Sequence, residues 1–147
     1  MLENPHILSY LNNYFFPINC IKDDFITKMN ILNKREQRTT IVLNNINLEL
    51  TSELINKKLE KIYNEKRTYN SIYTLREEWD IYNSGSCYIN FINSVYILNL
   101  LDNIDAFNGK KKCVFSWSDI QGDEFYSLMS EKRKKEQYLD FIVFNDF

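Results

Sequence analysis

The chain has 147 residues, of which 44% are hydrophobic and 15% aromatic, and its formal net charge is −2. This apolar content excludes a disordered chain, because burying it can offset the conformational entropy lost on folding. A net charge so near zero also excludes a strong global field that would attract nucleic acid or anionic lipid. The length suits a single domain spanning residues 1–147.

The cysteines and the hydropathy pattern point to a reducing compartment. Cys20, Cys87 and Cys113 are odd in number and widely spaced, which favours free thiols over a disulfide framework. No window approaches 18 uninterrupted apolar residues, and the N-terminus has no basic region followed by an apolar run. A cytoplasmic protein is therefore expected. The heavy use of Asn, Ile, Lys and Tyr, with Ala106 as the single alanine, is typical of an AT-rich genome.

Residues 1–39 are expected to form a helical N-terminal extension. Asn4 and Pro5 are suited to open a short helix, because proline at the first helical position loses no needed hydrogen bond. Asp23 and Asp24 are suited to start a second helix, whose apolar residues share one face. This apolar face predicts that the extension packs against the rest of the chain.

Two long helices are predicted in the middle of the chain. From a cap at Thr51 or Ser52, apolar residues keep helical spacing to about Tyr82, with a break near Asn70 as an alternative. The segment Tyr88–Ala106 follows as the most apolar helix, and its apolar residues cover most of its circumference. This second helix is therefore expected to lie at the centre of the fold.

Two short strands and a final helix complete the expected fold. The stretches around Ile41–Leu43 and over Cys113–Trp117 carry apolar residues at every second position, as strands of one small sheet do. Trp117 is expected to be buried against the helix at Tyr88–Ala106, and a helix is expected from Asp123 to Asn145. The predicted fold class is mainly α, with antiparallel helices around a two-stranded β-sheet.

An ordered series of residues over positions 40–147 resembles the N-terminal portion of the BRO domain of ALIX and the rhophilins. Upstream, the resemblance rests on Ile41–Leu43, on Leu75-Arg76 and on the apolar stretch Tyr88–Phe107. Downstream, it rests on an aromatic-x-Trp-x-Asp strand end, a glycine in the next turn, a Glu-Lys pair and a Phe-Asn pair: Phe115, Trp117, Asp119, Gly122, Glu131, Lys132, Phe144 and Asn145. The resemblance implies a helical, non-enzymatic protein-binding scaffold.

The sequence lacks the usual equipment of an enzyme. His6 is the only histidine, which disfavours catalytic constellations that need one, and the three glycines are too isolated to form a phosphate-binding loop. Asp119, Asp123 and Glu124 form an acidic cluster, but helix capping explains it better than a cation site does. No catalytic residue, cofactor, metal or small-molecule substrate is therefore expected.

Two clusters of basic residues are the candidate contacts to phosphate. A solvated surface is the first interpretation of both, and contact with RNA or with an anionic membrane is the second. The clusters consist of Lys110, Lys111 and Lys112 in a loop, and of Lys132, Arg133, Lys134 and Lys135 in the last helix.

The C-terminal residues are the candidate partner interface. Apolar side chains crowded on one helix point all round its axis, so they cannot all face one domain. The residues concerned are Phe141, Ile142, Val143, Phe144 and Phe147. The final helix is therefore predicted to dock into a partner.

Two functions are open at this point. The BRO resemblance implies recruitment of an ESCRT-III subunit in endosomal sorting or membrane remodelling. The alternative is a small factor bound to a large assembly such as the ribosome, which it stabilises or regulates. The basic clusters and the missing catalytic residues favour the alternative, and the slightly acidic net charge disfavours it.

Overall fold

A five-stranded antiparallel sheet organises the chain, with the strands in the order β4-β1-β3-β2-β5. This computed structural model describes residues 28–76, 80–135 and 140–144. The strands are β1 (Thr40–Asn44), β2 (Tyr69–Thr74), β3 (Ser86–Phe91), β4 (Val114–Trp117) and β5 (Phe141–Val143). The helices are α3 (Ser52–Ile62), α4 (Ile97–Asp102) and α5 (Gly122–Lys135), with 3-10 turns η1 (Ser94–Tyr96) and η2 (Ile104–Phe107) on either side of α4.

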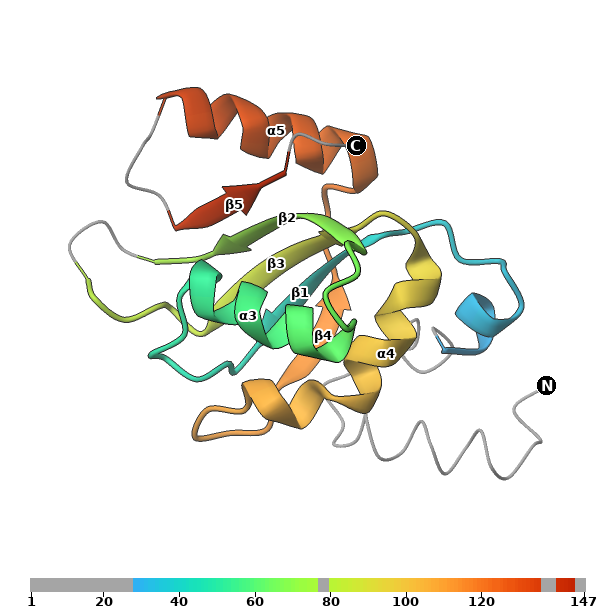
Figure 1. Cartoon of the computed structure of the whole chain (residues 1–147), viewed down its shortest axis with the longest axis horizontal. Helices are drawn as coiled ribbons and strands as arrows, with labels where there is room; N and C mark the ends of the chain where they lie inside the picture. The colour runs from blue at the N-terminus through green and yellow to red at the C-terminus, as the bar shows by residue number, and fades with distance from the viewer. Residues whose placement is uncertain (1–27, 77–79, 136–139, 145–147) are drawn as a thin grey trace.

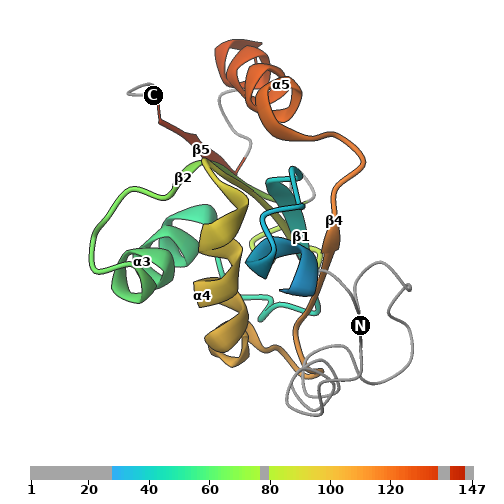
Figure 2. The same ribbon diagram turned by 90° about the vertical axis from the view of Figure 1, so that its right-hand side faces the viewer.

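The helices cover the two faces of the sheet unequally (Figures 1 and 2). Helices α3 and α4 lie on one face, which we call the inner face, whereas α5 packs on the opposite, outer face against β5, β2 and β3. From β1 to β4 the elements follow the order β-α-β-β-α-β, a split βαβ arrangement. Helix α5 and strand β5 are added after that unit.

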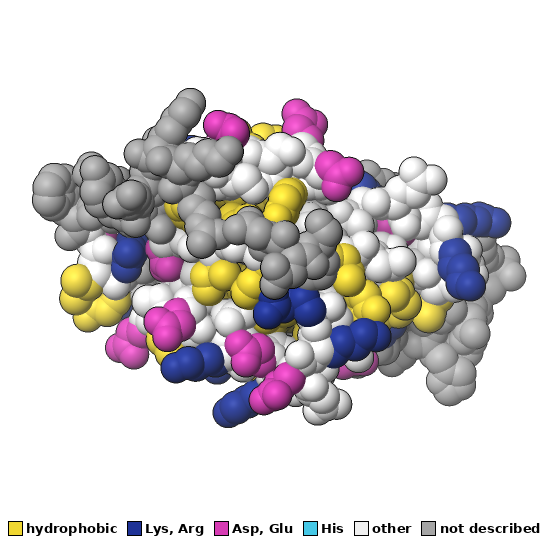
Figure 3. All heavy atoms as spheres, turned by 45° about the horizontal axis from the view of Figure 1, so that its top comes forward, with side chains coloured by type: hydrophobic (Ala, Val, Ile, Leu, Met, Phe, Trp, Pro, Cys, Tyr) yellow, Lys and Arg dark blue, Asp and Glu magenta, His cyan; other side chains and the backbone are white. Residues whose placement is uncertain are grey.

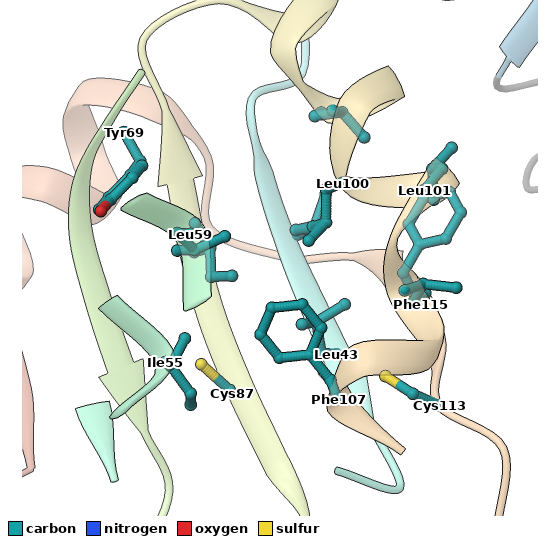
Figure 4. Close-up of a cluster of buried hydrophobic side chains, with 14 of the residues drawn as sticks. Leu43, Ile55, Leu59, Tyr69, Cys87, Leu100, Leu101, Phe107, Cys113 and Phe115 are labelled. Carbon is teal, nitrogen blue, oxygen red and sulfur yellow. The ribbon is translucent and has the colours of Figure 1, made fainter. Parts of the chain in front are cut away.

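The main hydrophobic core lies between the inner face and helices α3 and α4 (Figure 4). Ile55 and Leu59 of α3 and Leu100 of α4 are fully buried against Leu43 of β1. Helix α3 begins where the Thr51 hydroxyl accepts a hydrogen bond from the Leu54 amide, as an N-cap does. Its buried residues recur at helical spacing, so one face is apolar.

The predicted fold class is wrong, and so is the BRO resemblance on which it partly rested. Segments 69–74 and 88–91, which were expected in helices, belong to the adjacent strands β2 and β3. Both strands carry apolar or aromatic side chains on both faces, because α5 covers the outer face as α3 and α4 cover the inner one. Strands buried on both sides lose clean alternation, and short apolar runs of this kind resemble helices.

The prediction that Ile41–Leu43 and Cys113–Trp117 belong to one sheet is confirmed. Strands β1 and β4 pair antiparallel, with Ile41 opposite Trp117 and Leu43 opposite Phe115. Trp117, however, is half-buried rather than buried, because β4 is an edge strand. Its ring contacts the core on one side and lies 4.4 Å from the guanidinium carbon of Arg38.

The prediction of a continuous helix from Asp123 to Asn145 is also wrong. Helix α5 ends at Lys135, and Phe141–Val143 form strand β5, in which Ile142 pairs with Ile72 of β2. Side chains on a strand alternate between two faces, so the crowding that a helix would have caused does not arise. Val143 is buried under α5, and Phe144 packs against the main core. Phe147 and the expected helix at residues 6–14 lie outside the described residues.

Within the described residues, no helix is both long and apolar enough to cross a membrane.

Both described cysteines are free thiols and are buried in the main core (Figure 4). Burial raises the pKa of the Cys113 thiol to about 12 and the pKa of the Cys87 thiol well above its usual range. Because the reactive species is the thiolate, neither thiol is expected to react in the native state.

In a Cys20→Ser variant we expect no labelling by a thiol reagent at pH 8 in buffer, and labelling of two thiols in denaturant. Labelling of either thiol in the native protein at a rate approaching the denatured one would contradict this burial.

Candidate nucleic-acid interface

One row of side chains crosses the outer face from edge to edge. The strand register places Ser116, Val42, Tyr88, Tyr73 and Phe141 side by side, on β4, β1, β3, β2 and β5 in turn. The row is small and polar at the β4 edge and aromatic from β3 to β5. An outer sheet face of this composition offers ring surfaces beside hydrogen-bonding groups.

The aromatic part of this row continues into α5. The rings of Tyr73 and Tyr88 are stacked, with centroids 6.1 Å apart and an interplanar angle of 23°. Phe125 of α5 stacks on Tyr88 at 5.9 Å and 22°. Phe125 and Met129 are buried in a second, smaller hydrophobic core between α5 and the outer face, whereas both tyrosines stay half-buried. Helix α5 therefore adds the Phe125 ring to the stack and leaves part of each tyrosine side chain exposed.

A groove of about 460 Å³ lies between α5 and the part of the outer face that α5 leaves open. Val42 and Asn44 of β1 and Ser116 of β4 contribute to its floor, which Tyr88 continues. Leu128 and Lys132 of α5 line it from the other side, and the β4–α5 connection adds Asp119 and Ile120. The groove thus combines apolar surface, an aromatic ring, polar groups and charges of both signs.

The Gln121 side chain fixes the start of α5 to strand β1. Its Oε1 accepts hydrogen bonds from the amides of Thr39 and Thr40 at 2.9 and 2.8 Å. Its Nε2 donates to the carbonyl oxygens of Thr40 and Ser118 at 2.8 and 2.7 Å. Gly122 has a φ of +57°, which glycine adopts without strain, and its amide donates to Thr40 Oγ1 at 2.9 Å. This junction sets where the groove begins.

Beside the groove, the outer face continues in a buried polar network. Asn90 Oδ1 accepts from the hydroxyls of Thr39 and Thr40, and Asn90 Nδ2 donates to Asn70 Oδ1 at 2.9 Å. Buried polar groups are stable when they are hydrogen-bonded to one another, as these are. The part of the sheet below the start of α5 is therefore held by hydrogen bonds rather than by apolar packing.

The structure separates the predicted basic residues. Lys132 is half-buried and lines the groove, whereas Lys110 lines a different hollow that includes Leu48 and Tyr82. Lys111 and Lys112 are exposed in the loop before β4. Arg133, Lys134 and Lys135 complete α5, and their side chains lie outside what the structure describes. Of the predicted phosphate contacts whose side chains the structure describes, only Lys132 is thus found in the groove.

Charge is mixed on the side of the molecule that carries α5 and α3. Lys and Arg side chains alternate there with Asp and Glu side chains, and hydrophobic side chains lie between them (Figure 3). The chain has 18 basic and 20 acidic residues in total. A ligand with a phosphate backbone would therefore meet few positive charges at once.

The acidic cluster does not form a metal site among the described residues. No group of three His, Cys, Asp or Glu side chains there is arranged to hold a metal ion. Asp123 and Glu124 lie in the first turn of α5, where carboxylates stabilise a helix through its dipole.

Sequence reasoning missed the aromatic row and Asn44. Tyr73 and Tyr88 were interpreted as core positions of helices, because helical spacing accommodated them. The alternation of Ser86, Tyr88 and Asn90 against Cys87, Ile89 and Phe91 was the available signal for a strand with an amphipathic outer face. The groove itself left no such signal, since it depends on where α5 folds back.

No protein-family model matches the sequence, and no curated protein matches it. The chain is similar to the solved structure of the Rna15 RRM (RNA-recognition motif) with bound RNA (GU), at 14% identity and a TM-score of 0.47, covering 63% of this chain and 95% of that one. It is also similar to the second RRM domain of yeast poly(U)-binding protein (Pub1), at 12% identity and a TM-score of 0.40, covering 54% of this chain and 93% of that one. At these identities and TM-scores, neither likeness bears on what this chain binds. The observed five-stranded sheet is incompatible with a mainly helical scaffold, so the BRO-type scaffold and the ESCRT-III role it implied are wrong.

Proposed function

We propose that this chain binds single-stranded RNA in the groove between α5 and the outer face of β1 and β4. The observation that carries the proposal is the half-open groove beside the stacked rings of Tyr88 and Phe125. Single-stranded RNA is bound by splaying its bases onto aromatic side chains of a sheet and hydrogen-bonding their edges. Each stacked base contributes about 1 to 3 kcal/mol.

The polar groups of the groove suit the other parts of a nucleotide. Asn44 Oδ1 accepts a hydrogen bond from Ser86 Oγ at 2.9 Å, which orients the amide and leaves its Nδ2 available to donate. The Ser116 hydroxyl can donate or accept. Lys132 supplies a positive charge for one phosphate. The same groove would serve an RNA segment that belongs to a larger assembly.

The proposal is one of binding without catalysis. What supports it is the chemistry of the described nucleophiles: Cys87 and Cys113 are buried, and burial raises the pKa of both thiols. A buried neutral thiol is a poor nucleophile.

The test is the affinity for a labelled, mixed-sequence RNA octanucleotide, measured by fluorescence anisotropy over a salt series. Lys132→Gln should weaken binding several-fold and reduce the slope of log K against log salt by about 0.7, the value for one phosphate contact on a single strand. Lys61→Gln is the matched control, because Lys61 is exposed on α3, behind the sheet.

Lys61→Gln is expected to leave both the affinity and the slope unchanged. If wild-type protein does not bind the octanucleotide at low salt, or if the two variants weaken it equally, the groove is not an RNA site.

A further inference from the structure

Helix α5 already occupies the aromatic half of the outer face. Phe125 stacks on Tyr88, and the Phe141 ring meets the Tyr73 ring edge to face at 6.4 Å. Because α5 packs against β5, β2 and β3, bases cannot spread along the whole row from β4 to β5. The surface left open is the floor over β1 and β4.

Helix α5 is held near its start, and the strand that follows it is fixed to the sheet. The four hydrogen bonds of Gln121 fix the start, as described above. Tyr126, near the start of the helix, donates from Oη to the Phe144 carbonyl at 2.6 Å, and β5 pairs with β2 after the helix. Asp140, just before β5, accepts a hydrogen bond from the Ser52 amide through Oδ1 at 3.0 Å, and its carbonyl accepts from Ser52 Oγ and the Thr74 amide. Displacing α5 as a whole would break the contacts of Gln121 and Tyr126.

The size of the groove limits what it can hold. Its volume of about 460 Å³ is near the lower end of the range for ligand sites, about 300 to 1,000 Å³. Among the residues that line it, Lys132 is the only basic one that the structure describes. Sites that track a longer strand use a positively charged groove, and they span about 4 to 16 nucleotides in proteins that bind without sequence preference. Both the volume and the charge favour a shorter ligand here.

We propose that the groove is a site for about one or two nucleotides, with α5 as a fixed wall rather than a cover that moves away. This inference rests on the proposed RNA-binding function. One base lies over the neighbouring Val42 and Tyr88 on the floor and faces Leu128 on the wall, and the adjoining phosphate meets Lys132. The ligand would be a chain end or a base flipped out of a longer RNA, because a continuous strand has no path beneath α5.

The experiment is a titration of the wild-type chain with mixed-sequence RNA of one, two, four and eight nucleotides. Affinity should rise from the mononucleotide to the dinucleotide and then by no more than about sevenfold, the statistical gain from the seven dinucleotide registers of an octanucleotide. A rise of tenfold or more from two to eight nucleotides would overturn the short site. Absence of binding at every length would overturn the RNA-binding function, and the short site with it.

Hydrogen exchange tests the fixed wall separately. With the octanucleotide at saturation, the amides of α5 should exchange no faster than in the free protein. Faster exchange in residues 123–132 on binding would show that α5 moves away, and would overturn its role as a wall.

A variant with Leu128→Trp should lose at least tenfold in dinucleotide affinity, because the larger ring fills the groove from the exposed side of α5. Leu54→Trp, at a similarly exposed position on α3, should bind as wild type does.

Discussion

Replacing Phe91 with alanine is expected to lower the free energy of unfolding by about 3 to 5 kcal/mol. Phe91 ends β3 in the main core and is only 1% exposed. Its ring meets those of Tyr63 and Tyr69 edge to face, with centroids 6.1 and 6.4 Å apart. Truncation would leave a cavity that these two rings border, and a cavity adds to the lost transfer free energy. Such a loss is a large part of the stability of a domain this size.

The neighbouring residue provides the control for this prediction. Ile92 follows Phe91 directly and is 43% exposed. Ile92→Ala should therefore change the free energy of unfolding much less, by about 1 kcal/mol or under. Urea unfolding of both variants measures the difference. Equal midpoints for Phe91→Ala and Ile92→Ala would show that the Tyr63–Tyr69–Phe91 cluster is not part of the core.

Gln121→Ala is expected to loosen α5 while leaving the rest of the sheet folded. The substitution leaves the amides of Thr39 and Thr40 and the carbonyls of Thr40 and Ser118 without their side-chain partner. An unsatisfied buried group costs about 1 to 3 kcal/mol, and partial access of water lowers that cost here. We expect a loss of about 2 kcal/mol or more in the free energy that holds α5 on the sheet.

Native-state hydrogen exchange measures this loss element by element. In Gln121→Ala, amides of α5 should exchange at least tenfold faster, whereas those of β1 and β3 should stay protected. Gln37→Ala is the control, because Gln37 is exposed in the segment before β1. Unchanged protection of α5 in the Gln121 variant would mean that its hydrogen bonds do not position the helix.

The local patterns of the sequence identified two strands, and tertiary packing decided the remainder. Strands β1 and β4 were predictable because alternation is clear where one face is buried and the other is partly polar. Strand β2 was not, since Tyr73 beside Ile72 also fits a helix, and the alternation of β3 was overlooked because Tyr88 and Ile89 fit the helical spacing of the residues that follow. The start of α3 was predictable to within one residue, at Thr51 or Ser52, but its end near Ile62 was not, because Tyr69 and Ile72 continue a helical spacing by coincidence.

Most of the candidate site could not be predicted from the sequence. Lys132 was predicted as a phosphate contact and does line the groove, but the same reasoning grouped it with Lys110, which lies at another hollow. Asn44 and Tyr88 come together only through strand pairing between residues far apart in the chain. The C-terminal segment was also mispredicted because strand pairing decides its structure. Phe141 and Val143 would be crowded on a helix, but they belong to a strand that pairs with β2.

The most direct measurement of the central claim is an NMR titration of the labelled chain with an RNA dinucleotide. If the groove binds RNA, the largest amide shift changes should fall at Val42, Asn44, Ser116 and Leu128, which line it from three elements. Amides of α3, such as those of Leu54 and Lys61, lie behind the sheet and should not change. Shift changes centred on α3, or none at saturating RNA, would contradict the assignment of the groove as an RNA site.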